Sequence, residues 1–342
     1  MRTVLNRWTA VATAASCGLL MASGAAALAH KNDPAATDAP FIAAEAWAFP
    51  VSTAPGLQVL ALIHDGNKVL RVPGSTRSYR LSQLSLFNTP DWFPQAHPPM
   101  PEVVAHGRKP AWACSFCHLP DGEGEPASAS LAGLPEAYIL EQIRAFRSGE
   151  RGKGPWPTTQ DMDKEAQRVS DADLQQAAKY FSALRFKPQT RVVETASVPK
   201  TYWDSFSLVP NSSKAREPIG ERIVEVPANF KLYWLRDDDL GFIAYVPLRS
   251  IERGAVIAAN GAGAAPACEA CHGARLEGQT IPGIGVVPPL VGRSPTYIVR
   301  ELILFRLGRR TDPDAAPMRA EVSRLTLKDM IDVAAYAASR KS

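Results

Sequence analysis

Two five-residue segments of this chain repeat one pattern of cysteine and histidine. Residues 114–118 read Cys-Ser-Phe-Cys-His, and residues 268–272 read Cys-Glu-Ala-Cys-His. Two thiols three positions apart can each form a thioether to one vinyl group of the same porphyrin, and the next imidazole then lies under the iron. The pattern is typical of covalent haem attachment. We predict two haems of the c type, bonded to Cys114, Cys117, Cys268 and Cys271, with His118 and His272 as iron ligands.

The fifth and last cysteine, Cys17, lies in residues 1–29. There Arg2 and Arg7 precede an uncharged stretch that ends Ala27-Leu-Ala29, which is typical of a secretory signal peptide with its cleavage site. We therefore expect export to the periplasm, where thioether attachment takes place. The alternative is an uncleaved segment that tethers the protein to the membrane, because residues 8–29 approach the length of a membrane span.

The remaining composition limits the function classes. Removal of 29 residues from 342 leaves 313, enough for two or three domains. Loss of Arg2 and Arg7 lowers the formal net charge from +4 to +2. A near-neutral chain does not indicate a nucleic-acid partner, for which a concentrated basic face is expected. Because porphyrin takes all four mature cysteines, we expect no disulfide.

The two halves of the chain match at an offset of 159 residues, which indicates an internal duplication. The matched pairs are Gly133/Gly292, Tyr138/Tyr297, Phe146/Phe305, Arg147/Arg306, Gly149/Gly308 and Arg151/Arg310. Apolar residues at helical spacing lie between the tyrosines and the second glycines, so each half should contain a helix that ends at its glycine. The paired arginines suit haem propionates, an acidic partner or solvated helix ends.

A second matched helix follows in each half. Ser170 with Asp173, and Thr326 with Asp329, are capping-box patterns that open apolar stripes. The stripes are Leu174, Ala177, Phe181 and Leu184 in one helix, and Met330, Val333, Ala334 and Ala337 in the other. We expect these stripes in the core, and a packing role for Tyr180 and Tyr336.

Two methionines are the best candidates for the sixth iron ligand. Met162 and Met318 follow His118 and His272 by 44 and 46 residues, and each precedes its helix cap by eight. We expect each to come from a loop that folds over the far face of the porphyrin. A methionine ligand raises the reduction potential relative to a second histidine.

The first of these ligands has rivals. Met162 is flanked by Asp161 and Asp163, a polar setting for a thioether. Its principal rival is Met100, just before the first haem segment. Three histidines that precede this segment could also supply the ligand, namely His64, His97 and His106.

With these motifs, residues 99–188 and 251–342 resemble the bacterial diheme cytochromes c, in which two class I units are joined in tandem. The resemblance implies a mainly α fold with two tandem class I cytochrome c domains and two covalently bound haem c groups. In that family a proline carbonyl commonly accepts the hydrogen bond of the proximal imidazole, which Pro288 or Pro289 would supply here. Ser130 replaces Pro289 in the first unit, so that unit should make this bond another way.

The rest of the chain falls outside the resemblance. We divide the sequence into a signal peptide (1–29), an N-terminal extension (30–98), cytochrome domain 1 (99–188), a linker or insertion with short β-strands (189–250) and cytochrome domain 2 (251–342). Strands are expected at 57–63 and 68–72, as a hairpin, and at 222–226, 231–235 and 241–246. These added parts either cover and orient the haem units or dock a partner.

The resemblance implies a periplasmic carrier of single electrons between redox partners, such as a dehydrogenase or an oxidase. The protein would then be an electron-transfer protein without catalysis of its own, with a role as the accepting subunit of a dehydrogenase as one form. The alternative is a diheme enzyme such as a cytochrome c peroxidase, which needs an openable distal side. A thiosulfate-oxidising enzyme needs a further cysteine, and a double zinc site would use the same thiols.

Overall fold

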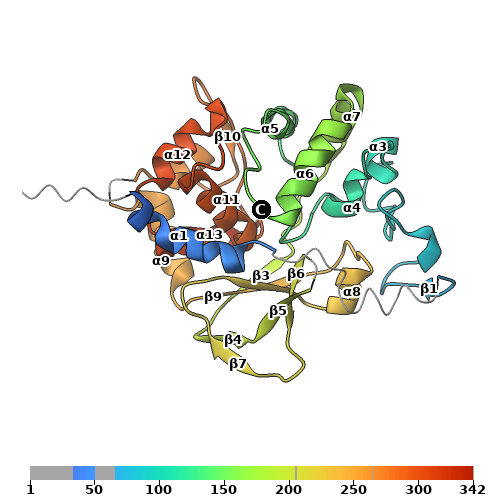
Figure 1. Cartoon of the computed structure of the whole chain (residues 1–342), viewed down its shortest axis with the longest axis horizontal. Coiled ribbons are helices and arrows are strands. Elements are labelled where there is room, and N and C mark those ends of the chain that lie inside the picture. The colour runs from blue at the N-terminus through green and yellow to red at the C-terminus, as the bar shows by residue number, and fades with distance from the viewer. Residues whose placement is uncertain (1–33, 51–65, 205, 264, 342) are drawn as a thin grey trace, which may run out of the picture. The chain divides into compact units, whose positions relative to one another are not determined.

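The computed structural model describes residues 34–50, 66–204, 206–263 and 265–341. The predicted signal peptide, with Cys17, lies outside these ranges. By packing, the chain divides into residues 1–37 and a compact unit of residues 38–342, and the contacts below lie within the second. Helix α1 (Pro34–Ala48) begins the described chain (Figure 1). The five-part division of the sequence stays a prediction.

The first haem unit is helical. Its elements are α3 (Glu102–Ala105), α4 (Cys114–His118), α5 (Glu136–Arg147), α6 (Pro157–Arg168) and α7 (Asp171–Ala183). The predicted cap of α7 is confirmed, since the Asp173 N–H donates to Ser170 Oγ at 3.1 Å. Val104, Ile139 and Phe181 form part of one buried cluster that joins α3, α5 and α7. Tyr180 packs as expected, and its hydroxyl donates to the Pro120 carbonyl at 2.7 Å.

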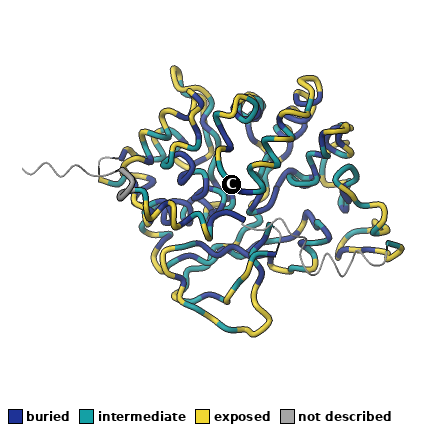
Figure 2. Tube along the Cα trace, in the orientation of Figure 1, coloured by how far each residue is buried: buried dark blue, intermediate teal, exposed yellow. Residues whose placement is uncertain are grey.

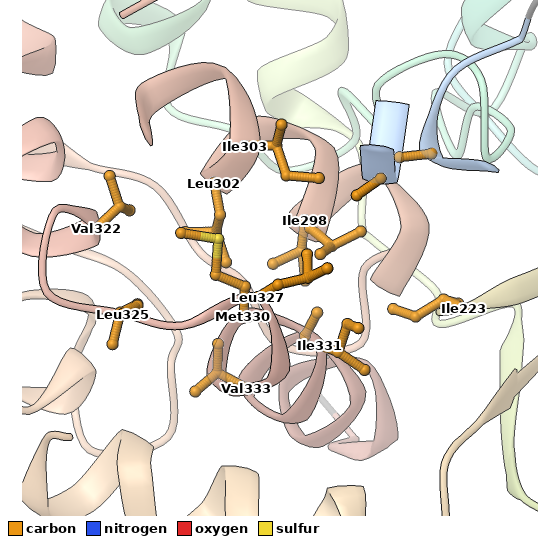
Figure 3. Packing of buried hydrophobic residues seen from close by; sticks show 14 of the residues in the cluster. Ile223, Ile298, Leu302, Ile303, Val322, Leu325, Leu327, Met330, Ile331 and Val333 are labelled. Carbon is orange, nitrogen blue, oxygen red and sulfur yellow. The ribbon is translucent and has the colours of Figure 1, made fainter. Parts of the chain in front are cut away.

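The second haem unit repeats this order with α9 (Ser250–Asn260), α10 (Cys268–His272), α11 (Pro295–Arg306), α12 (Ala316–Val322) and α13 (Leu327–Ser339). Its core is confirmed around Met330, which is fully buried among Ile298, Leu302 and Ile331 (Figure 3). The apolar stripes of the matched helices therefore meet in a buried cluster in each unit, and Figure 2 colours the buried residues along the chain.

Two changes of spacing distinguish the units. The haem segments are offset by 154 residues, but α5 and α11 by 159, because the second unit adds a hairpin of β10 (Gln279–Ile281) and β11 (Gly285–Val287). Helices α7 and α13 are offset by 156, since α12 ends sooner than α6. The duplicated elements keep their order while the connections between them vary.

The N-terminal extension contains a short strand pair that the sequence did not indicate, and the predicted hairpin of 57–63 with 68–72 stays a prediction. Strand β1 (Val69–Leu70) pairs antiparallel with β2 (Tyr79–Arg80). The predicted first hairpin strand, 57–63, lies outside the described residues, as does His64. A short 3-10 helix, Leu81–Gln83, follows β2. The apolar cluster of this region is Leu70, Val72, Trp92 and Leu235, so the extension packs against the insertion.

The insertion contains short strands, as predicted. Its main sheet has the order β3 (Thr190–Glu194), β9 (Phe242–Val246) and β8 (Val224–Pro227), with β3 and β9 parallel. Two further antiparallel pairs join β4 (Ser197–Pro199) to β7 (Arg216–Pro218) and β5 (Thr201–Asp204) to β6 (Ser207–Pro210). The strand predicted at 231–235 is wrong, because α8 (Phe230–Trp234) forms there. Asn229 caps this helix, and its aromatic residues follow helical spacing.

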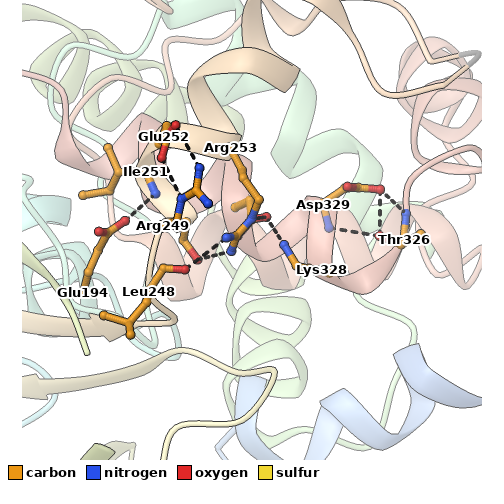
Figure 4. A network of polar contacts seen from close by, with 11 residues as sticks. Glu194, Leu248, Arg249, Ile251, Glu252, Arg253, Thr326, Lys328 and Asp329 are labelled. Atoms are coloured by element: carbon orange, nitrogen blue, oxygen red, sulfur yellow. Dashed lines mark hydrogen bonds and ion pairs between the residues drawn. The ribbon is translucent and has the colours of Figure 1, made fainter. Parts of the chain in front are cut away.

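Polar contacts attach the insertion to the second haem unit. Glu194 at the end of β3 accepts a hydrogen bond from the Ile251 N–H at 2.8 Å (Figure 4). Next to it, Arg253 on α9 forms a bidentate ion pair with the buried Asp332 on α13, at 2.7 and 2.9 Å. Ile223 of the insertion is fully buried in the second unit's core. The insertion is therefore part of the folded body.

Candidate haem sites

The first haem segment forms one helical turn, α4, which brings its three functional side chains to one side. Both thiols are free, and burial raises the pKa of Cys114 and of Cys117 to about 12. Thioether formation removes these groups from titration, so it suits a buried position. Burial likewise lowers the pKa of His118, which keeps the imidazole neutral.

The tautomer of His118 is fixed by the backbone. Its Nδ1 lies 2.8 Å from the Ala129 carbonyl oxygen, and a carbonyl can only accept, so Nδ1 carries the proton. The lone pair of Nε2 is thereby free for iron. A hydrogen bond from the other ring nitrogen is the usual support of a metal-binding histidine.

A cavity of about 1430 Å³, including its part open to solvent, lies beside α4. Cys114, Cys117, His118 and Met162 all line it. Most of the other lining side chains are apolar, among them Leu131, Ile139, Ile143, Phe146, Leu174 and Phe181. Two thiols, a neutral imidazole, a thioether and apolar walls are the donor set and surroundings that haem requires, so these residues fit the group.

Met162 lies on helix α6, which corrects the expectation of a loop. Its side chain packs against Ile143, Ala166 and Leu174. Of the two flanking aspartates, Asp161 also lines the cavity, where it lies 3.3 Å from Lys164 Nζ, and Asp163 does not line it. The structure therefore brings Met162 into the cavity with His118, while its ligation of iron stays a prediction.

The rivals of Met162 that the structure describes, Met100, His97 and His106, do not line this cavity. Met100 packs against the cluster of Val103 and Val104 and is not among the cavity-lining residues. His97 is held by Asp91 and Tyr180, at 3.2 and 3.0 Å. His106 also does not line the cavity.

The second haem segment has the same local geometry. Burial lowers the pKa of His272 and raises the pKa of Cys268 to about 11. His272 Nδ1 lies 2.9 Å from the Pro288 carbonyl oxygen, which confirms one of the two predicted acceptors. Met318, on helix α12 and also not in a loop, packs with Cys268 against the same apolar cluster. Met318 and Cys268, one of the two predicted thioether residues, therefore pack against the same hydrophobic core.

The two proximal hydrogen bonds use equivalent acceptors, since Ala129 and Pro288 are 159 residues apart. The expectation that Ser130 forces a different arrangement is wrong. The acceptor is a backbone carbonyl, which any residue type provides when the chain path is the same.

The matched arginines are tied to protein groups, so their interpretation as solvated helix ends is wrong. Arg151 and Arg310 are 6% and 4% exposed and share Gln142 and Glu301 as partners. Arg147 Nε donates to the Ala166 carbonyl at 2.7 Å, and Arg306 pairs with Asp38 at 3.0 Å.

Some residues of the first haem cavity come from distant parts of the chain, which motif reasoning missed. Phe206 belongs to the insertion, and Tyr297, Arg300 and Glu301 belong to α11 of the second unit. One sequence feature could have indicated that α11 lies near this site: the offset of 159 residues pairs Gln142 with Glu301 and Tyr138 with Tyr297.

Within the described ranges, no three His, Cys, Asp or Glu side chains are grouped so as to hold a metal ion. A tetrahedral zinc site needs four such ligands. The two Cys-Cys-His segments therefore lack the geometry that the zinc hypothesis requires. No described helix is both long and apolar enough for a membrane crossing.

No family model matches this chain. Comparison with known proteins finds cytochromes and an electron acceptor among its relatives. Cytochrome c4 of Azotobacter vinelandii is 26% identical over 238 residues, which are 68% of this chain and 87% of that protein. The thiosulfate dehydrogenase electron acceptor of Thiomonas intermedia (strain K12) is 28% identical, over 63% of this chain and 73% of that one. Cytochrome c-554(548) of Halomonas halodenitrificans is 36% identical over 81 residues, which are 23% of this chain and 94% of its own.

Solved structures are similar at low scores. Thiosulfate dehydrogenase from Marichromatium purpuratum has a TM-score of 0.43 and 27% identity, and the match covers 70% of this chain but only 39% of that chain. Cytochrome c4 of Acidithiobacillus ferrooxidans has a TM-score of 0.43 and 22% identity, with 66% and 98% of the two chains covered.

The chain has two Cys-Cys-His turns, and in each the imidazole is held by a backbone carbonyl. This arrangement is that of a protein with covalently bound haem, and the relatives indicate the class of haem protein. The chain belongs to the c-type cytochromes, as a diheme member with two tandem class I units and two haem c groups. It is an electron-transfer protein: the relatives carry the names cytochrome c4 and thiosulfate dehydrogenase electron acceptor, and these names do not favour the peroxidase alternative.

Proposed function

We propose that His118 and Met162 would hold the iron of the first haem, and that His272 and Met318 would hold the iron of the second. Each haem supplies a one-electron couple. The first cavity carries the proposal, because both thiols, the Nδ1-held imidazole and the thioether of Met162 line one largely apolar space. Apolar walls exclude water and hold the iron in a low-dielectric setting, and methionine ligation favours a high potential.

The attachment is tested by mass. The purified protein should exceed the mass of its polypeptide by two haems, and its colour should survive acid-acetone extraction. Cys114→Ala/Cys117→Ala and Cys268→Ala/Cys271→Ala should each lose one haem and keep the other. A full-length protein without added haem mass would contradict the proposal.

We infer that the protein is exported after cleavage behind Ala29. The mature N-terminus is then His30, and the haem protein is recovered in the periplasmic fraction. N-terminal sequencing with cell fractionation tests this. Recovery in the membrane fraction with Met1 or residues 2–29 still present would establish the tethered form instead.

We further propose that the electron donor is a dehydrogenase, with thiosulfate dehydrogenase as the first candidate. The support is that two relatives are named thiosulfate dehydrogenase electron acceptor, at 28% and 26% identity. Oxidised protein should be reduced when that enzyme and thiosulfate are both added, as followed by the absorption bands of reduced haem.

Two controls separate the possibilities. Thiosulfate without the dehydrogenase should leave the protein oxidised; reduction in that control would show activity of this chain itself. If the complete mixture also fails to reduce the protein while dithionite does, the partner is wrong and the haem sites stand.

A further inference from the structure

Three buried side chains and one partly buried side chain form a polar network between the two haem units. They are two matched pairs at the offset of 159, Gln142 with Glu301 and Arg151 with Arg310. Both arginines donate to Gln142 Oε1 at 2.7 Å. Glu301 Oε1 lies 3.1 Å from Arg151 Nη2, and Oε2 lies 2.8 Å from Arg310 Nη1. Each unit thus contributes one arginine and one acceptor.

The network departs from its internal symmetry at one position, since the first unit has the neutral Gln142 where the second has Glu301. Burial by itself raises the pKa of the Glu301 carboxyl, but Arg151 and Arg310 outweigh burial and the pKa is lowered. Glu301 is therefore an anion at neutral pH. Its side chain is only 15% exposed, so water screens its field weakly.

The network lies against the first haem site. Gln142, Arg151 and Glu301 all line the cavity that contains His118 and Met162. Tyr297 lines it too, and its hydroxyl accepts from Arg151 Nη2 at 3.0 Å. A carboxylate of the second unit thus belongs to the wall of the first unit's site.

A fixed buried anion changes the balance between two oxidation states of a nearby iron. The ferric haem carries one more positive charge than the ferrous haem, so an anion in the wall stabilises the ferric form and lowers the potential. The wall also contains the cations Arg151 and Arg300, which act in the opposite sense. Two carboxylates of the first unit, Asp161 and Glu165, act in the same sense as Glu301 and are paired with Lys164 and Arg168. The second unit adds Arg300 and Glu301 to this wall, and Glu301 stands at the position where the first unit has the neutral Gln142.

We propose that Glu301 is a redox-tuning residue of the first haem, supplied from the second haem unit, and that the Gln142/Glu301 difference sets part of the gap between the two potentials. The proposal rests on haem occupying the first cavity as described above. Glu301 is not one of the proposed iron ligands; it would act through its electric field.

Two single variants of the holoprotein test the proposal. Glu301→Gln removes the anion and should raise the first midpoint potential, with about a tenfold change in the redox equilibrium, or about 59 mV. Gln142→Glu adds an anion to the same wall and should lower it by a similar amount. Spectroelectrochemical titration resolves the two couples, and Met162→His identifies the first by moving it strongly downwards.

The opposite signs are the decisive readout, because a merely structural disturbance has no reason to reverse with the charge. The double variant Gln142→Glu/Glu301→Gln keeps the number of charges and should return close to the wild-type potential. Shifts of the first couple in the same direction in both single variants, or no shift in either, would overturn the proposal.

A separate control is needed for variants that do not fold. Glu301→Gln removes the carboxylate that both buried arginines share, although Arg310 keeps Asp312 at 3.9 Å, and this loss can prevent folding. Gln142→Glu instead adds a second carboxylate for the two arginines. If only this variant yields folded protein, the midpoint potential of its first haem is the test: a lower potential supports the proposal, and an unchanged or higher potential refutes it. Haem mass is measured on every variant, so loss of haem is distinguished from a failure of tuning.

Discussion

His118 donates its Nδ1 proton to the carbonyl oxygen of Ala129 at 2.8 Å, although Ala129 and its neighbour Ser130 replace two prolines of the second unit. The equivalent bond of His272 ends on Pro288. The backbone path, set by the matched helices on either side, positions the acceptor. Side-chain identity at this point is therefore free to change without loss of imidazole orientation.

Ser130→Ala should leave the first haem unaffected, because the acceptor for His118 is the Ala129 carbonyl. The Ser130 hydroxyl accepts from Arg293 at 3.0 Å and donates to the Gly122 carbonyl at 3.5 Å, and Arg293 keeps its bonds to the Ser130 and Ala132 carbonyls. We expect an unchanged midpoint potential and a loss of roughly 0.5–1.5 kcal/mol in unfolding free energy. Redox titration and urea unfolding measure the two. A shifted potential would mean that the hydroxyl supports the imidazole.

Met162→Ala should remove the weak thioether-to-iron band at the red end of the oxidised spectrum and lower the potential of one haem. Met100→Ala is the matched control, since Met100 packs outside the cavity, and it should leave band and potential unchanged. Loss of the band in Met100→Ala with retention in Met162→Ala would reverse the ligand assignment.

Gly254→Ala should destabilise the second unit, although alanine favours helices. A Cβ at Gly254 would lie 2.0 Å from the Asp332 carbonyl oxygen, so α9 and α13 would have to separate. We expect a loss of about 1–3 kcal/mol, as for overpacking. Gly66→Ala is the control, because its nearest contact is an ordinary 3.5 Å to Ser82 Cβ. Thermal unfolding compares them, and an equal effect of both would contradict the close-approach argument.

Asp238 should make stability fall as the pH rises. Burial, and then Asp121, raises the pKa of Asp238 to about 8, and one of its carboxyl oxygens has no partner. The folded state therefore holds this proton more tightly than the unfolded state, and stability is lost between about pH 4 and pH 8. Asp238→Asn should be more stable than wild type at pH 9, with the advantage shrinking towards pH 5.

The exposed Asp239 provides the control for this prediction. Asp239→Asn should change the unfolding free energy little at either pH. Chemical unfolding at pH 5 and pH 9 measures both variants. A stabilisation of Asp238→Asn that is equal at the two pH values would contradict the titration argument.

Much of the fold was predictable because local patterns agreed with it. The spacing of Ile139, Ile143 and Phe146 predicted α5, and the Thr326–Asp329 capping box predicted the start of α13, where both bonds form. The strand expected at 231–235 failed because aromatic residues suit either structure and the Asn229 cap decided for helix. At Met162 the sequence misled in another way: the residues next to it in the chain are polar, but the residues that its side chain packs against are apolar.

The sequence by itself determined the chemistry: two Cys-Cys-His turns, their duplication and two matched methionines, all of which are local or periodic signals. Only the tertiary structure decided which side chains share a site. Glu301 and Phe206 reach the first haem cavity across 183 and 88 residues from His118, and no spacing rule predicts such contacts. The reason is physical: covalent attachment needs a fixed local spacing, whereas the walls and charges around a site come from whichever elements pack there.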